Sequence, residues 1–231
     1  MPLPTVPSVV VFDVNETLSD MAPMAGRFAD IGLPPQLAAT WFASVLRDGF
    51  ALAVAGEQQP FATIAAGALR TAFAGAQLDT DTDAAVEHVL AGLRALRLHP
   101  DVATGLRALA GTGRRLVTLS NGASSVAEDL LAGAGVRDAF EQLLSVADAG
   151  VWKPARESYR YASRQCGTPP GDMLLVAVHP WDVDGAARAG MQTAWVDRTG
   201  MPYPPYFTPP SITVTGVDDL ARRLGSAGRS D

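Results

Sequence analysis

The stretch VVVFDVNETLSD, residues 9–20, places a carboxylate where an apolar segment ends. Val9 to Phe12 are apolar enough for the middle of a sheet, and Asp13 follows them directly. A carboxylate cannot be buried without partners except at a high free-energy cost. One interpretation is a turn or helix-capping residue, because Asp, Asn and Thr favour turns. The other is a functional carboxylate that the strand presents to a ligand at the edge of a sheet.

Three further strand-like segments also end in polar residues. RRLVTLS leads to Ser120 and Asn121, LLSV leads to Lys153, and LLVAV leads to His179, Trp181 and Asp182. Each ending taken alone has a turn interpretation. In open parallel sheets, however, ligands bind beyond the carboxyl ends of the strands. Four polar endings on one rim therefore favour a binding or catalytic site over turn chemistry.

The elements that position these residues alternate between strands and helices. From about residue 100 onward, β-branched apolar runs alternate with segments of helical spacing, which predicts βαβ units and a parallel sheet with helices on both faces. Residues 21–97 differ, because they are rich in Ala and Leu at helical spacings and predict three or four successive helices. We therefore expect an α/β, Rossmann-like doubly wound core of residues 1–20 and 98–231, interrupted by a helical cap domain of residues 21–97.

Composition narrows the class of protein. The 231 residues carry a formal net charge of −6 and no basic cluster, which argues against a nucleic-acid partner. No apolar run reaches the ~18 residues of a membrane span, and the N-terminus lacks the basic region of a signal peptide. The single cysteine, Cys166, excludes an internal disulfide and fits a reducing cytosol. We expect a soluble cytoplasmic protein with no membrane partner. Its three histidines have no metal-site spacing.

The order of the polar endings resembles the haloacid dehalogenase (HAD) superfamily of hydrolases. The first motif of that superfamily has a nucleophilic aspartate with Thr four residues later, as in Asp13 and Thr17. The second is a Ser or Thr ending the next strand, as in LSNG, and the third is a lysine, here Lys153 in VWKP. The fourth is an acidic residue after another apolar strand, here Asp182. The match covers nearly the whole chain, so a HAD-like core with an inserted cap is implied.

The magnesium-dependent phosphatases of this superfamily fit the sequence poorly. They need a second carboxylate two positions after the nucleophile, where this chain has Asn15, which has no titratable proton to donate. They also need an acid four or five residues before the last aspartate, where this chain has Val178 and Ala177. Mg²⁺ prefers hard oxygen ligands, and too few carboxylates are present. No metal site or cofactor is expected; Mg²⁺ belongs only to the phosphatase alternative.

The resemblance is closer to the metal-free branch, the L-2-haloacid dehalogenases (type II). LSNG, the KP pair followed by Tyr159, the pair Trp181-Asp182 and WVDRTG are similar to the pattern of that branch. The implied mechanism is covalent catalysis, in which Asp13 displaces halide from C2 of a small 2-halocarboxylate and forms an ester. Water then releases a 2-hydroxy acid. The resemblance also implies a homodimer.

The resemblance implies a role for each motif residue. Lys153 would keep the Asp13 carboxylate ionised, and Asp182 would hold Lys153 and orient or deprotonate the water. Thr17 would hydrogen-bond the nucleophile loop. The remaining implied roles concern substrate binding: Ser120 for the substrate carboxylate, Asn121 for the departing halide, Tyr159 as a donor and Trp181 as an apolar wall. Core packing is an equal interpretation for Tyr159 and Trp181, and Asp182 also suits a helix N-cap.

Three positions depart from the family pattern. The family has a halide-binding arginine directly after a tryptophan on the first cap helix, where this chain has Phe42. Arg47, five residues later, falls on a different helix face. His179 stands where the family usually has asparagine, and it is either a general base for ester hydrolysis or a ring stacked on Trp181. The first motif reads NET rather than aromatic-Gly-Thr, so Asn15 also alters the pocket.

Three functions remain open at this point. The first is a 2-haloacid dehalogenase, and the second is a related hydrolase acting on another small molecule, phosphate esters included. The third is a non-catalytic binding protein on the same scaffold. The presence of Asp13, Ser120, Lys153 and Asp182 together speaks against the third, because binding alone does not require that set.

Overall fold

The computed structural model describes residue 3 and residues 5–227. Six parallel strands form one sheet in the order β3-β2-β1-β4-β5-β6. They are β1 (Val9–Phe12), β2 (Arg115–Ser120), β3 (Gln142–Ser145), β4 (Met173–Ala177), β5 (Gln192–Val196) and β6 (Ile212–Val214). The chain reverses its winding direction at β1, between β2 and β4, so the crevice at the end of β1 is the topological switch point of the sheet.

Helices cover both faces of the sheet. They are α5 (Val102–Ala110), α6 (Ser124–Gly133), α7 (Val146–Ala149), α8 (Arg156–Cys166), α9 (Pro180–Arg188) and α10 (Val217–Ala227), with 3₁₀ turns at Arg137–Ala139 and Pro170–Asp172. Successive residues of β1 point to opposite faces. Val9 and Val11 pack in the apolar cluster that includes α8 and α9, whereas Val10 and Phe12 pack in the cluster that includes α5 and α10. The α/β doubly wound fold predicted from the sequence is confirmed.

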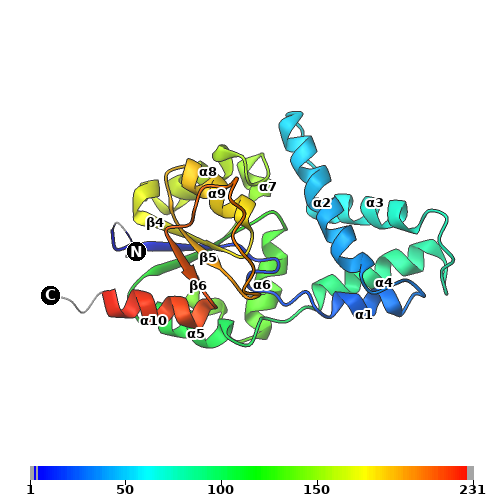
Figure 1. Cartoon of the computed structure of the whole chain (residues 1–231), viewed down its shortest axis with the longest axis horizontal. Helices are drawn as coiled ribbons and strands as arrows, with labels where there is room; N and C mark the ends of the chain where they lie inside the picture. Colours follow the sequence, from blue (N-terminus) through cyan, green and yellow to red (C-terminus); the bar gives the residue numbers. More distant parts are fainter. Residues whose placement is uncertain (1–2, 4, 228–231) are drawn as a thin grey trace.

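Four helices lie between β1 and α5 in the chain. They are α1 (Met24–Ala29), α2 (Leu37–Val54), α3 (Phe61–Phe73) and α4 (Thr82–Arg94), and Figure 1 shows them together at one side of the sheet. Their shared core is aromatic: the Phe28 ring lies 5.9 Å from Trp41 and 6.4 Å from Phe73. The indole of Trp41 donates to the Ala65 carbonyl oxygen at 3.0 Å, which ties α2 to α3.

The two chain segments that lead into and out of these helices run side by side. Ser19 and Leu98 form an isolated antiparallel bridge, and Asp20 N–H donates to the Arg97 carbonyl oxygen at 2.8 Å. They lie beside the ends of segment 21–97, for which the sequence predicts a cap. The predicted core segments also include residues 1, 2, 4 and 228–231, which lie outside the described residues.

Trp152, from the sheet core, packs against helices α2 and α3. The Trp152 indole donates to the Gln59 carbonyl oxygen at 3.1 Å and stacks on Phe61 at 5.8 Å with an interplanar angle of 8°. The backbone of Gly49 in α2 lies so close to Trp152 that an added Cβ would meet the indole ring at 2.3 Å. Glycine is therefore required at this crossing.

One helix of the described residues, Leu37–Val54, is long and apolar enough to cross a membrane when judged by length and composition. A core helix of a soluble protein passes the same test. This helix buries Trp41, Phe42 and Val45 against its neighbours.

Candidate active site

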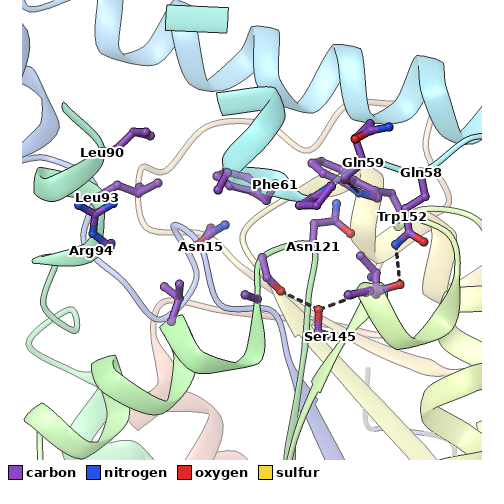
Figure 2. Close-up of a pocket in the computed structure, with 17 residues that line it drawn as sticks. Asn15, Gln58, Gln59, Phe61, Leu90, Leu93, Arg94, Asn121, Ser145 and Trp152 are labelled. Atoms are coloured by element: carbon purple, nitrogen blue, oxygen red, sulfur yellow. Dashed lines mark hydrogen bonds between the residues drawn. The ribbon is translucent and has the colours of Figure 1, made fainter. Parts of the chain in front are cut away.

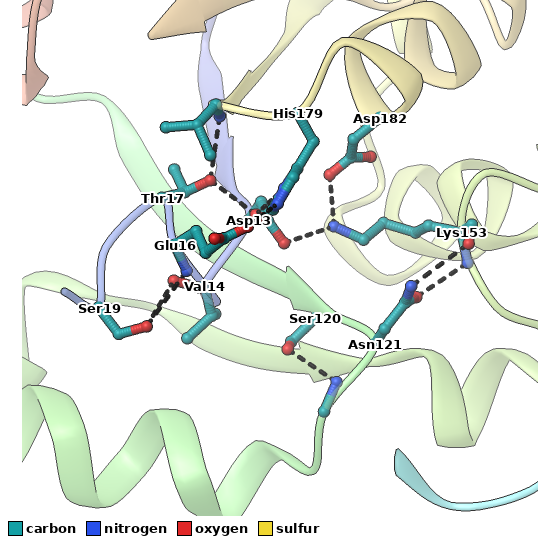
Figure 3. A network of polar contacts seen from close by, with 12 residues as sticks. Asp13, Val14, Glu16, Thr17, Ser19, Ser120, Asn121, Lys153, His179 and Asp182 are labelled. Carbon is teal, nitrogen blue, oxygen red and sulfur yellow. Dashed lines mark hydrogen bonds and ion pairs between the residues drawn. The ribbon is translucent and has the colours of Figure 1, made fainter. Parts of the chain in front are cut away.

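The carboxylate of Asp13 is the centre of a buried polar cluster at the switch point (Figure 3). Its backbone N–H donates to the Val176 carbonyl oxygen at 3.1 Å, which continues the sheet by one residue. Oδ1 accepts a hydrogen bond from Lys153 Nζ at 2.9 Å, and Oδ2 accepts one from Thr17 Oγ1 at 2.6 Å. Burial by itself would raise the pKa of Asp13, but the charges of Lys153 and His179 outweigh it and hold the pKa well below its usual range.

Lys153 bridges two carboxylates from different strand ends. Its Nζ lies 2.5 Å from Asp182 Oδ2, and the lysine side chain is closed to solvent. Burial would lower the pKa of Lys153, yet Asp13 and Asp182 raise it above its ordinary value, so the ammonium stays charged. The pKa of Asp182 is raised, first by burial and then by the charge of Asp13, although Lys153 opposes both. Asp182 is therefore the more basic of the two carboxylates.

Tyr159 and Asn121 hold this bridge in position. The Tyr159 hydroxyl donates to Asp182 Oδ1 at 2.7 Å, so this buried tyrosine orients the carboxylate and is not exposed to a ligand. Asn121 Oδ1 accepts from the Lys153 backbone N–H at 2.9 Å, and its Nδ2 donates to the Lys153 carbonyl oxygen at 3.3 Å. Ser120 lies beside them, and its Oγ accepts from Gly122 N–H at 2.9 Å. The end of β2 therefore fixes the loop that delivers Lys153.

His179 joins the cluster through both ring nitrogens. Nδ1 lies 3.1 Å from Asp13 Oδ2, Nε2 lies 2.7 Å from Glu16 Oε2, and the ring stacks on Trp181 at 4.9 Å. Burial would lower the pKa of His179, but the hydrogen bonds and charges of Asp13 and Glu16 raise it to about 9. The raised pKa disfavours the general-base role expected for His179 near neutral pH, because a protonated ring cannot accept a proton. The stacking on Trp181 is confirmed.

Phe42 does not reach this cluster. Its ring is buried among the aromatic residues of α2 and α3, 6.5 Å from Trp41 and 6.3 Å from Phe61. Phe42 is absent from the described residues that line the neighbouring cavity, so this geometry does not support the substrate-binding role expected for it. Trp181 packs its ring 4.9 Å from Phe50 of α2, and Lys153 Nζ lies 5.8 Å from its centroid. Trp181 is thus an apolar wall between the sheet core and α2.

A cavity of about 180 Å³ adjoins the cluster between the sheet core and the helices α3 and α4 (Figure 2). Asn15 and Asn121 line it, and Asn121 hydrogen-bonds the Lys153 backbone, whereas Asp13 and Lys153 are not among its described lining residues. Its wall is mainly apolar, with Phe61 and Trp152 on one side and Leu90 and Leu93 on another. Arg94, at the end of α4, is the cationic side chain among the described lining residues. It also forms an ion pair with Glu87.

Sequence reasoning assigned no role to Arg94 or Trp152, and it indicated only that Glu16 alters the pocket, without its partner. Glu16 was visible in the NET motif, but its pairing with His179 depends on a loop 163 residues away. Arg94 gave no signal, because the contact between α4 and the sheet core is not encoded in local spacing. Trp152 stands in the VWKP motif, but its contacts with Phe61 and with Gln59, 93 residues away in the chain, depend on packing. Among the described residues, no group of three or more His, Cys, Asp or Glu side chains has the arrangement of a metal site.

Comparison with known proteins identifies the family. The sequence profile of the haloacid dehalogenase-like hydrolases matches residues 7–190. The chain belongs to this family. Among curated dehalogenases, the chain is 30% identical to haloacetate dehalogenase H-2 of Moraxella sp. (strain B) over 93% of its own length and 96% of that protein. It is 31% identical to an (S)-2-haloacid dehalogenase of Pseudomonas sp. (strain YL), covering 90% of each chain.

Solved dehalogenase structures share the complete fold. The crystal structure of an L-2-haloacid dehalogenase, RSc1362, superposes with a TM-score of 0.88 at 29% identity, covering 96% of this chain and all of that one. The L-2-haloacid dehalogenase from Xanthobacter autotrophicus superposes with a TM-score of 0.86 at 25% identity, covering 95% and 99%. The resemblance to the haloacid dehalogenase branch is confirmed, and this dehalogenase-like hydrolase retains the motif residues in one cluster.

Proposed function

We propose that this hydrolase is a metal-independent 2-haloacid dehalogenase that works through a covalent ester on Asp13. One observation carries the proposal: a buried, ionised Asp13 lies 2.9 Å from the charged Lys153, and Asn121, which hydrogen-bonds the Lys153 backbone, lines a small, mainly apolar cavity. A carboxylate kept anionic at any pH near neutrality is a nucleophile without further activation. Relatives of this chain include a haloacetate dehalogenase and an (S)-2-haloacid dehalogenase, which supports a 2-halocarboxylate substrate.

In the first step, Asp13 attacks C2 of the substrate and a bond forms between C2 and a carboxylate oxygen. The bond between C2 and the halogen breaks, and the halide leaves with its electron pair. Lys153 holds the attacking carboxylate in place throughout, since its own position is fixed by Asp182 and by Asn121. The product of this step is a neutral ester.

In the second step, water attacks the ester carbon of Asp13. Asp182 is the proposed base, because its pKa is raised while that of Asp13 is depressed, and such opposite shifts assign base and nucleophile within a pair. The bond from the Asp13 carbon to the ester oxygen breaks, and the 2-hydroxy acid leaves with the former Asp13 oxygen. The water oxygen stays on Asp13.

The substrate carboxylate needs a cation or neutral donors. Arg94 is the cation that we propose for it, since it lines the cavity from α4 while Phe42 occupies the family arginine position inside the helical core. Asn121 lines the same cavity, and with Ser120, the residue before it in the chain, it supplies the neutral donors that we propose. The cavity volume of about 180 Å³ suits a short haloacid better than a long-chain one.

The donors around Asp13 do not fit a divalent cation. Lys153, Thr17 and His179 already occupy its two oxygens, and two of these three side chains are themselves cationic. The residues four and five positions before Asp182 are Val178 and Ala177, which have no oxygen donors in their side chains. The mechanism therefore includes no metal-dependent step.

We propose a cytoplasmic homodimer in which residues 21–97 act as the cap of a core formed by residues 1–20 and 98–231. The packing of α1–α4 around Phe28, Trp41 and Phe73 supports the cap, and the buried free Cys166 fits a reducing compartment. Light scattering at several concentrations measures the oligomeric state. A monomer at all concentrations contradicts the dimer.

Halide release tests the function directly. Chloride release is assayed with each enantiomer of 2-chloropropionate in the presence of EDTA. We expect release from at least the S enantiomer. Asp13→Asn abolishes it, while Asp129→Asn, on the exposed face of α6, leaves it unchanged. In a single turnover in ¹⁸O water, the label enters Asp13 and the first product stays unlabelled. Label appearing first in the product contradicts the ester, and Mg²⁺-dependent release of p-nitrophenol from its phosphate with no chloride release favours a phosphatase instead.

A further inference from the structure

Glu16 and His179 form an ion pair that touches the nucleophile. Glu16 Oε2 lies 2.7 Å from His179 Nε2, and the other ring nitrogen of His179 lies 3.1 Å from Asp13 Oδ2. Glu16 adopts φ = 61°, a left-handed conformation that favours glycine and costs a glutamate roughly 1 kcal/mol. Glu16 is the one non-glycine residue with a positive φ among the described residues. Glu16 holds this backbone conformation while its carboxylate contacts His179.

The two carboxylate oxygens of Asp13 accept different numbers of hydrogen bonds. Oδ2 accepts from Thr17 Oγ1 and from His179 Nδ1, so two donors fill its in-plane lone pairs. Oδ1 accepts from Lys153 Nζ and keeps a lone pair for attack. Oδ1 is therefore the nucleophilic atom, and Oδ2 becomes the carbonyl oxygen of the ester.

We infer that Thr17 and the His179 imidazolium form an oxyanion site for hydrolysis of the Asp13 ester, and that Glu16 is the positioning residue that keeps His179 charged and oriented. This inference rests on the proposed ester mechanism and adds Glu16 to it. It gives His179 a role opposite to that of a general base, because the ring donates a hydrogen bond and keeps its proton.

The charge balance of hydrolysis explains why a cation is useful at this position. When water adds to the Asp13 carbon, the carbonyl π electrons move to Oδ2, and the water proton goes to Asp182. Oδ2 then carries a full negative charge against two preset donors, Thr17 Oγ1–H and His179 Nδ1–H. Collapse restores the carbonyl, breaks the bond between the Asp13 carbon and Oδ1, and returns the proton from Asp182 to the departing alkoxide. Asp13 is left as the carboxylic acid that carries the second water proton, and it loses this proton to solvent to regenerate the ionised nucleophile. Preset donors at a developing oxyanion are among the largest single contributions to catalysis.

The groups that face His179 come from several elements. Asp13 lies at the end of β1, Glu16 in the following loop, and Trp181 on α9; Lys153 lies on the far side of Asp13. Ester formation removes the Asp13 charge and leaves Glu16 as the anion hydrogen-bonded to the ring. His99 Nε2 meets the Glu16 carbonyl oxygen at 3.0 Å and steadies the loop.

Trapping the ester tests the inference. The enzyme is mixed with (S)-2-chloropropionate and quenched for intact-mass analysis, while chloride is followed in parallel. In His179→Ala we expect the lactyl ester on Asp13 to accumulate, its hydrolysis slowed about 10²- to 10³-fold, with the first-turnover chloride release changed only a few-fold. Glu16→Gln slows hydrolysis about tenfold and moves the alkaline limb of its pH profile to lower pH.

Glu16→Gly separates this role from folding. It removes the carboxylate but relieves the positive φ, so the relieved strain of roughly 1 kcal/mol offsets part of the lost ion pair, and we expect a folded protein with the kinetic defect of Glu16→Gln. If hydrolysis in Glu16→Gly proceeds at the wild-type rate, Glu16 has no positioning role. If His179→Ala slows chloride release and not ester hydrolysis, His179 serves the first step and the oxyanion site is wrong.

A measurement made without substrate distinguishes failure of the oxyanion site from failure of the proposed dehalogenase function. The ¹⁵N resonances of the His179 ring report its protonation: we expect imidazolium at pH 7 in the wild type and a titration at lower pH in Glu16→Gln. A neutral His179 at pH 7 overturns the oxyanion site even if chloride is released. A wild type that releases no chloride from any 2-haloacid overturns the dehalogenase function, and with it the hydrolytic role of Glu16.

Discussion

The Lys153 ammonium lies 2.9 Å from Asp13 Oδ1, and both side chains are buried. Lys153 is also 2.5 Å from Asp182, so one cation serves two carboxylates that the folded protein closes to water. Breaking a buried ion pair by removing one partner leaves an uncompensated charge, which is far more costly than losing a surface pair. The same cluster therefore supports both the stability of the core and the chemistry proposed for it.

Lys153→Met keeps the length of the side chain and removes its charge. We expect the free energy of unfolding to fall by about 3–5 kcal/mol at pH 7, because Asp13 and Asp182 lose their shared partner. The rate of chloride release falls at least about 10²-fold, since the nucleophile is no longer held as an anion. Urea denaturation measures the first effect, and Arg47→Met, on an exposed side chain of α2, is the control. A stability loss below about 1 kcal/mol contradicts this account.

Stability depends on pH through His179. Its pKa is raised from 6.5 to about 9 on folding, so its contribution is fully present below pH 6.5 and is lost as the pH rises through 9. The rise corresponds to roughly 3 kcal/mol. Asp13 has the opposite sign, since its depressed pKa contributes above pH 3.8 and is lost on acidification. Urea titrations between pH 6 and 10 should show a decline in wild type that His179→Asn flattens; equal slopes in the two proteins would exclude it.

Thr17 links the nucleophile to β4. Its hydroxyl donates to Asp13 Oδ2 at 2.6 Å and accepts from Val178 N–H at 3.1 Å. Thr17→Val removes both hydrogen bonds at nearly constant volume, so we expect a loss of about 1–3 kcal/mol in stability and of about 10²-fold in turnover. Thr17→Ser retains the hydroxyl and should stay within a few-fold of wild type. Similar kinetics for the Val and Ser variants would show that the hydroxyl is dispensable.

The crossing of α2 and Trp152 has no room for a methyl group. Gly49→Ala places a Cβ 2.3 Å from the indole, so we expect a destabilisation of about 1–3 kcal/mol and a displaced α2. Gly67→Ala is the matched control, because its Cβ would meet nothing within 4 Å and alanine should stabilise α3 by about 0.5–1 kcal/mol. Trp152 fluorescence and thermal unfolding measure both variants. A Gly49→Ala protein as stable as wild type contradicts the packing.

Arg94 supplies charge to the cavity wall. If it binds the substrate carboxylate, Arg94→Gln should raise KM for 2-chloropropionate about tenfold and change kcat little, since the residue binds substrate and transition state alike. Arg47→Gln, paired with Asp48 on the outer side of α2, should change neither constant. Steady-state chloride release measures both. An unchanged KM in Arg94→Gln would move carboxylate binding to the neutral donors Ser120 and Asn121.

The motif residues could be placed from the sequence because parallel strands have a fixed direction. Asp13, Ser120, Lys153 and Asp182 each follow an apolar run, and the parallel register of β1 with β2 and β4 brings those endings to one rim. Burial of a strand on both faces requires a continuous apolar run, which is a local property of the sequence. The fold class therefore followed from the alternation of strands and helices, and the core of the polar cluster from the polar residues at the strand ends and from the family resemblance.

The partners of each side chain were decided by the tertiary structure. Asn121 lies on the Lys153 backbone, Phe42 is enclosed by other aromatic rings, and His179 is charged because the NET loop and the β4–α9 loop meet. The Glu16–His179 contact joins loops 163 residues apart and the Asn121–Lys153 contact joins residues 32 apart, and in each case packing, not local spacing, sets the approach. The sequence by itself determined which groups reach the rim; only the packed chain decided their protonation and their neighbours, because pKa values and cavity walls depend on burial and charge from every side.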